Sequence, residues 1–162
     1  MRFRIPLPLA IVLACAFLVA SAFLILSPRV AYTRQATSAY DAALGRWQAT
    51  DRSSYAITVI SNSLTQPTGG TNTIRVDAGR VTQAHNPNCP DCSIEAFAAL
   101  TVEGLFQRIQ TECLRDFPIQ FCGVDYHPSL GFPVRIDTYP YNRHGQERPS
   151  ISVEDVQFRD AQ

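Results

Sequence analysis

The sequence predicts an α+β protein in which an N-terminal transmembrane helix precedes a two-layer domain. The domain is expected to contain a mainly antiparallel sheet and two helices. Three observations support this prediction: an uncharged apolar run at residues 5–27, two segments with the apolar spacing of helices, and six segments that alternate or form hairpins. The expected order is helix, three strands, helix, three strands (α-βββ-α-βββ), with the helices on one face of the sheet.

The apolar run at residues 5–27 is long enough to cross a membrane. It contains no charged residue, and as a helix it would extend about 34 Å, against a bilayer core of about 30 Å. Pro28 is expected to end it, because proline cannot continue a helix without cost. The expected organisation is a cytoplasmic tail (1–4), a transmembrane anchor (5–27), a linker (28–36) and an extracytoplasmic α+β domain (37–160).

Two alternatives remain open for the apolar run. Ala20-Ser21-Ala22 has the small-residue pattern of a signal-peptide cleavage site. Cys15 follows Val-Leu-Ala, which resembles a bacterial lipobox and would make the protein lipidated. Both positions lie inside the apolar run, where further apolar residues follow them, so we favour an uncleaved anchor.

The cysteines predict the compartment of the domain. Two arginines lie before the run and two soon after it, so the positive-inside rule gives no clear orientation. Four cysteines follow the anchor, an even number that suits an oxidising compartment. We therefore expect a single-pass protein of the cell membrane with its C-terminal domain outside the cytoplasm. The expected partners are the membrane, through residues 5–27, and an envelope protein.

The composition excludes several classes of function. The formal net charge is zero and the isoelectric point is about 6.8, so the chain has no basic surface typical of nucleic-acid binding. The chain contains no lysine, which excludes a Schiff base or a P-loop. No Gly-x-Ser-x-Gly nucleophile elbow occurs. We therefore expect no catalytic residue, no cofactor and no metal, and a non-enzymatic role in binding a protein or a cell-envelope component.

Two segments have the apolar spacing of amphipathic helices. The first lies between residues 37 and 49, where the spacings i, i+3, i+4 and i+7 make one stripe. The second is expected to begin with Thr101 as its N-cap and Glu103 in its first turn. The stripe of the first helix contains Tyr40, Ala43, Leu44 and Trp47. The buried face of the second is expected to contain Val102, Leu105, Phe106, Ile109 and Cys113.

Six segments are predicted to be strands because they alternate or flank turn residues. A hairpin is expected around Gly79, which supplies the positive φ of a tight turn. In the last strand the apolar residues change phase between Val153 and Val156, which predicts a bulge at Glu154 and Asp155. The predicted strands cover residues 55–60, 73–77, 80–84, 121–126, 132–139 and 150–158.

Several stretches of the soluble part together resemble a known family. The most specific is Val124-Asp-Tyr-His-Pro-Ser-Leu-Gly-Phe-Pro133, followed by Ile136-Asp137. The others are Trp47 followed by Tyr55, Arg75-Val-Asp-Ala-Gly-Arg-Val81 and Thr101-Val-Glu-Gly-Leu-Phe106. From about Ala43 to Phe158 the chain resembles the bacterial domain of unknown function family 6174. The resemblance implies an exported protein, often anchored to a membrane or a lipid, and it implies no activity.

The motif Cys89-Pro-Asp-Cys92 is the sharpest candidate site. A dithiol at this spacing can exchange disulfides, which gives the alternative hypothesis of an envelope thiol–disulfide oxidoreductase using Cys89 and Cys92. The motif lies in a predicted loop without the βαβ pattern of thioredoxin-like proteins, so we favour a structural role. The expected disulfides are Cys89–Cys92 and Cys113–Cys122, with a cross-pair such as Cys89–Cys122 as the main alternative. A zinc site that includes His85 is less favoured, because Cys113 and Cys122 lack the usual ligand spacing.

Asp125 and His127 form a candidate polar site. They lie two residues apart on a predicted strand and therefore share a face, where the carboxylate could orient the imidazole for acid–base work. At the mouth of a hairpin both side chains can instead hydrogen-bond the turn, which is the interpretation we favour. A hydrolase using this pair is a third and weaker hypothesis. A set of aromatic residues is expected in the core rather than in a ligand site: Trp47, Phe106, Tyr126 and Phe132.

Overall fold

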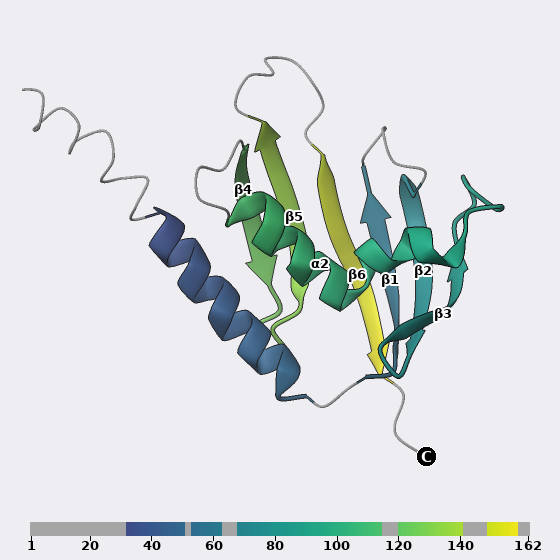
Figure 1. Ribbon diagram of the computed structural model, residues 1–162, viewed down its shortest axis with the longest axis horizontal. Helices are drawn as coiled ribbons and strands as arrows, with labels where there is room; N and C mark the ends of the chain where they lie inside the picture. Colours follow the sequence, from purple (N-terminus) through teal and green to yellow (C-terminus); the bar gives the residue numbers. More distant parts are fainter. Residues whose placement is uncertain (1–31, 51–52, 63–67, 115–119, 141–148, 159–162) are drawn as a thin grey trace, which may run out of the picture. The chain divides into compact units, whose positions relative to one another are not determined.

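A computed structural model describes residues 32–50, 53–62, 68–114, 120–140 and 149–158. The predicted transmembrane segment, residues 5–27, lies outside these ranges. Within them, no helix has both the length and the apolar character that a membrane span requires. Residues 40–162 form one compact unit, whose helices and strands are shown in Figure 1.

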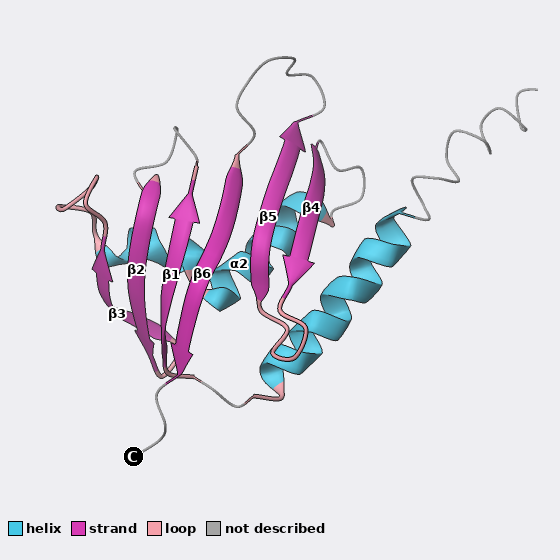
Figure 2. Ribbon diagram, turned by 180° about the vertical axis from the view of Figure 1, so that it is seen from behind, coloured by secondary structure: helices cyan, strands magenta, loops and turns pink. Residues whose placement is uncertain are grey.

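Six strands form one sheet in the order β3-β2-β1-β6-β5-β4, and every neighbouring pair is antiparallel (Figures 1 and 2). The first three strands are neighbours, and so are the last three. The pairing of β1 with β6 joins these two groups in the middle of the sheet. The strands are β1 (Tyr55–Ser61), β2 (Gly70–Asp77), β3 (Arg80–His85), β4 (Gln120–Tyr126), β5 (Pro133–Pro140) and β6 (Ser150–Phe158).

The bulge predicted in the last strand is confirmed. Thr58 lies opposite Asp155, while the next residue, Val59, lies opposite Val153. Glu154 is therefore the extra residue of β6. An extra residue restores the alternation of a strand whose apolar residues change phase, so that the apolar side chains before and after it face the same side of the sheet.

Three helical segments follow β3 and lie along one face of the sheet, in front of it in Figure 1 and behind it in Figure 2. They are a 3₁₀ helix η1 (Ile94–Leu100), α2 (Val102–Arg108) and a π-helical turn η2 (Ile109–Cys113). The predicted N-cap of α2 is confirmed, since the side-chain oxygen of Thr101 accepts a hydrogen bond from the backbone N–H of Gly104 at 3.0 Å. The sequence predicts α2 but not η1.

The first helix covers residues 32–48 and is drawn in blue in Figure 1. Residues 32–36 are therefore helical, whereas the sequence predicts a linker there and a helix from residue 37. The stripe predicted for this helix is confirmed for Tyr40, Ala43 and Trp47, which are all buried, and Leu44 packs half-buried beside them.

The core lies between the helices and the sheet. The predicted face of the second helix is buried along its whole length, from Val102 to Cys113. The ring of Trp47 meets Tyr55 edge-on at a centroid distance of 5.5 Å and Phe132 at 6.2 Å. Phe106 is buried and stacks on the half-buried Tyr126 at 6.2 Å, so the expected aromatic set lies in and around the core.

Gly131 fixes the turn between β4 and β5 against the first helix. Its φ is +83°, and a Cβ atom there would lie 2.1 Å from the carbonyl oxygen of Ala43 and 2.9 Å from the Cβ of Arg46. Only glycine tolerates both this backbone conformation and this approach. The contact therefore sets the position of residues 40–48 beside the sheet.

Candidate functional site

The four cysteines of the domain form two local disulfides. The sulfur–sulfur distances are 1.99 Å for Cys89–Cys92 and 2.06 Å for Cys113–Cys122. The structure thus has the two local pairs rather than a cross-pair. His85 is exposed at the end of β3, and no three metal-ligating side chains gather within the described ranges of the chain.

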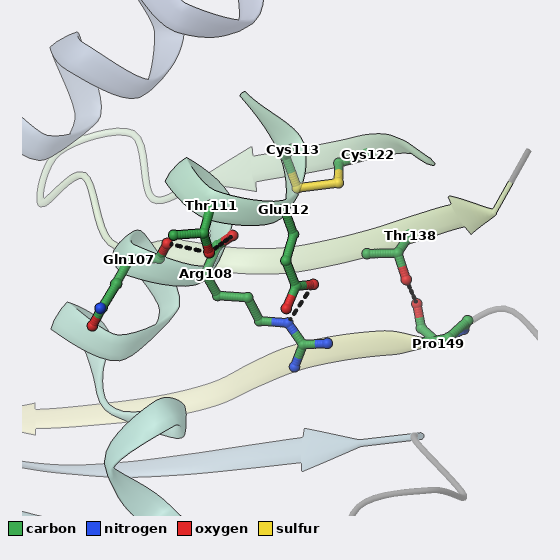
Figure 3. Close-up of polar contacts among 8 residues, drawn as sticks. All are labelled: Gln107, Arg108, Thr111, Glu112, Cys113, Cys122, Thr138 and Pro149. Atoms are coloured by element: carbon green, nitrogen blue, oxygen red, sulfur yellow. Dashed lines mark hydrogen bonds and ion pairs between the residues drawn. A yellow bond between two sulfur atoms is a disulfide. The ribbon is translucent and has the colours of Figure 1, made fainter. Parts of the chain in front are cut away.

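The Cys113–Cys122 disulfide joins the end of η2 to β4 (Figure 3). Both cysteines are buried. Nearby, the Nε atom of Arg108 lies 3.1 Å from Oε2 of Glu112, one helical turn along. The disulfide links the end of the helical segment to the sheet, and the ion pair lies within that segment.

Buried asparagines hold the loop that carries Cys89 and Cys92. Asn72 is fully buried in β2, and its Oδ1 accepts a hydrogen bond from Nδ2 of Asn86 at 2.7 Å. Oδ1 of Asn86 in turn accepts a hydrogen bond from the backbone N–H of Asn88 at 2.7 Å. These hydrogen bonds fix the loop to β2 independently of its disulfide. Sequence reasoning missed this network, although an asparagine inside a strand is an unfavourable choice and hence a signal.

Asp125 and His127 make separate contacts in the structure. Nδ1 of His127 accepts the backbone N–H of Leu130 at 3.1 Å, and its ring stacks on Phe132 at a centroid distance of 4.8 Å. Asp125 is exposed and lies opposite Arg135 on β5. His127 therefore supports the turn, and the lone pair of its Nδ1 atom is occupied by the hydrogen bond from Leu130.

A groove of about 440 Å³ lies between residues 40–48 of the first helix and the helical segment formed by α2 and η2. Apolar and aromatic side chains, among them Tyr40, Leu44 and Phe106, form part of its lining. Among the lining residues that the structure describes, only Glu103 is charged. The uncharged polar residues that line the groove are all exposed: Gln48, Ser53, Gln107 and Gln110.

Two aromatic side chains hold the Glu103 carboxylate in a fixed position. The hydroxyl of Tyr55 donates to Oε2 at 2.5 Å, and Nε1 of Trp47 donates to Oε1 at 3.2 Å. We call these three residues the carboxylate clamp. The Tyr55 hydroxyl also accepts the backbone N–H of Val102, the first residue of α2, at 3.0 Å. The clamp therefore joins the first helix, β1 and α2.

The protonated hydroxyl of Tyr55 is the donor of the clamp, and the Glu103 carboxylate is the acceptor. Burial raises the pKa of the Tyr55 hydroxyl, and the neighbouring Glu103 carboxylate raises that pKa further. Tyr55 therefore stays a donor at neutral pH. Each oxygen of an ionised carboxylate has two acceptor positions, so Glu103 can accept further hydrogen bonds from a ligand. Within the described part of the chain, no arginine or histidine forms an ion pair with Glu103.

From the sequence, the three clamp residues are expected in a helix, a strand and a helix start, and none of them is predicted to belong to a site. They come from separate segments, so no local pattern brings them together. One signal was present, since all three lie in stretches that carry the family resemblance: Trp47 followed by Tyr55, and Thr101 to Phe106.

The chain belongs to a family of unknown function (DUF6174), whose model matches residues 39–158. The match includes every strand of the sheet and all three clamp residues, so the resemblance noted in the sequence is confirmed. No match is found among curated proteins or among solved structures. A functional hypothesis therefore depends on the chemistry of the groove.

Proposed function

We propose that this member of the DUF6174 family is a membrane-anchored binding domain that binds a protein or another cell-envelope component in the groove beside Glu103. The observation that carries the proposal is the carboxylate clamp. Fixing a glutamate side chain costs conformational entropy. Binding sites use polar groups fixed in this way, because the ligand then meets a group that is already oriented.

The lining of the groove favours binding over hydrolysis. Among the described residues that line it there is no histidine, cysteine or basic side chain, and its hydroxyl groups are those of Ser53 and Tyr40. Burial and the nearby Asp41 raise the pKa of the Tyr40 hydroxyl, which makes it a poorer nucleophile at neutral pH. The groove therefore offers hydrogen bonds and one negative charge rather than an activated nucleophile.

Two features support an anchored location outside the cytoplasm. The apolar run of residues 5–27 is long enough for a transmembrane helix. The two disulfides of the domain are of the kind that persists in oxidising compartments. Peptide mapping of the membrane fraction without reduction tests this location. The expected result is a retained N-terminal segment and two intact disulfides, whereas a reduced protein in the soluble fraction would contradict it.

Site-specific photo-crosslinking tests the binding role. A photoreactive amino acid is placed at Gln110, which lines the groove, in the full chain in its own membrane. The matched control position is Gln157, which is exposed and lies opposite Ala56 on the face of the sheet away from the helices. We expect an adduct of defined mass at Gln110, absent from Gln157 and lost when Leu44→Trp fills the groove. Equal adducts at both positions, or adducts insensitive to Leu44→Trp, would exclude the groove.

One observation supports the alternative, thiol–disulfide exchange at Cys89 and Cys92. Their disulfide is only half-buried, and Cys92 comes directly before Ser93, the N-cap of η1. A helix N-terminus favours the thiolate of the nearer cysteine, so Cys92 is the expected attacking thiol and Cys89→Ser should leave it to accumulate mixed disulfides in the membrane fraction. If Cys89→Ser and Cys92→Ser both fold and trap no mixed disulfide, this alternative is excluded.

A further inference from the structure

We infer that the ligand of the groove is an extended peptide segment whose arginine or lysine side chain pairs with Glu103. This inference rests on the proposed function and names the class of ligand. It is carried by the charge of the groove, by the amide side chains on its two walls and by their spacing.

The charge of the groove selects a cation. Among the described residues that line the groove only Glu103 is charged, and the clamp fixes its carboxylate without a cationic partner in the described segments. A guanidinium or ammonium group would complete this site with a charge-assisted hydrogen bond. A phosphate or another anionic ligand is disfavoured, because none of the described lining residues is an arginine that could balance its charge.

The amide side chains favour a peptide backbone over a lipid chain. Gln48 lies on the first helix, and Gln107 and Gln110 lie on the opposite wall. Each glutamine offers a donor and an acceptor, which match the C=O and N–H groups of an extended chain. An acyl chain would cover these amides without giving them partners, at a cost for each unsatisfied group.

The spacing along the helical wall fits an extended chain. Glu103 and Gln107 are four residues apart on α2, which is about 6 Å along the axis. Side chains on one face of an extended peptide repeat every two residues, or about 6.6 Å. A ligand lying along α2 can therefore place its cationic side chain at Glu103 while its backbone reaches Gln107.

Trp47 supplies the assay, because it is the only tryptophan of the chain and it lines the groove. The full chain in detergent micelles is titrated with two pools of acetylated pentapeptide amides. The central residue is arginine in one pool and its neutral isostere citrulline in the other, and the remaining positions carry Gly, Ala, Ser or Thr. We expect the arginine pool to change the fluorescence at a concentration about tenfold lower than the citrulline pool. This ratio corresponds to a difference of about 1.4 kcal/mol in binding free energy. The difference should shrink in high salt.

The substitution Gln107→Arg tests the role of Glu103 while the clamp stays complete. An arginine four residues after a glutamate on a helix can pair with it, so the internal guanidinium should occupy the carboxylate. We expect the preference for the arginine pool to fall below about twofold, while the urea midpoint does not decrease. The matched control is Gln157→Arg, which adds the same charge on the far face of the sheet and should keep the preference.

The outcomes separate this inference from the proposed function. If both pools change the fluorescence equally, or if both arginine variants lose the preference together, Glu103 does not select a cation and the inference is wrong. If neither pool binds but crosslinking at Gln110 still yields an adduct, the groove binds another class of ligand. If crosslinking at Gln110 fails as well, the proposed function is also wrong.

Discussion

Replacing Tyr55 by phenylalanine removes one oxygen atom from the carboxylate clamp. That oxygen donates to Glu103 at 2.5 Å and accepts the N–H of Val102 at 3.0 Å. Tyr55 is 1% exposed and Val102 is fully buried. Water therefore cannot replace the lost partner of the Val102 N–H, and the substitution leaves that group unsatisfied.

The expected cost follows from these two contacts. A hydrogen bond to a charged group contributes about 1.5–3 kcal/mol, and a buried N–H left without a partner costs about 1–3 kcal/mol. Because one oxygen makes both contacts, the two values do not simply add, and we expect a loss of about 3 kcal/mol in the free energy of unfolding. With a urea m-value of about 2 kcal/mol per M, the unfolding midpoint should fall by about 1.5 M.

The assay is urea unfolding of the full chain in detergent, followed by far-ultraviolet circular dichroism. Fluorescence is unsuitable here, because Trp47 itself belongs to the clamp. The matched control is Tyr126→Phe, which removes a hydroxyl that has no hydrogen bond to any other residue described in the structure, and its midpoint should fall by less than about 0.5 M. A shift for Tyr55→Phe no larger than that of Tyr126→Phe would refute the reasoning.

Gly131→Ala should destabilise the domain by about 3 kcal/mol, because the added methyl group combines a left-handed backbone with a collision against the first helix. Thermal unfolding measures this, and an unchanged melting temperature would contradict the contact. Replacing both Cys113 and Cys122 by serine should cost about 1 kcal/mol more than the same change at Cys89 and Cys92, because the longer loop, with a separation of 9 residues against 3, loses more entropy when it is closed. Urea unfolding without reductant compares the two variants, and the opposite order would show that strain or packing decides. The clamp tyrosine should make the domain unstable in alkali: its pKa in the folded state is raised above the ordinary value of 10.0, so its contribution is complete below pH 10 and is lost as the pH rises further. The loss should be about 1.4 kcal/mol per pH unit, and tyrosinate absorbance at 295 nm should reach its full value only as the ellipticity is lost.

Local patterns predict most elements of this fold because each element buries one face. The stripe of Tyr40, Ala43 and Trp47 is a helix period, and all three side chains are buried. The phase change between Val153 and Val156 predicts the bulge at Glu154, because a strand that must keep its apolar residues on one face needs an extra residue where the alternation breaks.

The elements that local patterns do not predict are short or depend on distant contacts. η1 has only seven residues, and its two buried side chains, Phe97 and Leu100, are too few to make a helical stripe. The clamp is harder still, because Tyr55 and Glu103 are 48 residues apart and meet only once the sheet and α2 have packed. The groove between the helices has the same origin, so neither it nor its charge could be predicted from the sequence.

The place of β6 in the sheet also governs when the domain can form. The last strand of the domain in chain order becomes a central strand, paired with β1 from the start of the domain. Pairings between such remote parts of a chain form slowly and late. For a domain exported as we propose, translocation can therefore proceed with the polypeptide still unfolded, and the sheet closes only after its C-terminal strand has crossed. A product truncated before Ser150 would lack β6, so β1 and β5 would each have one unpaired edge. Premature termination is therefore expected to cause aggregation and not only a loss of stability.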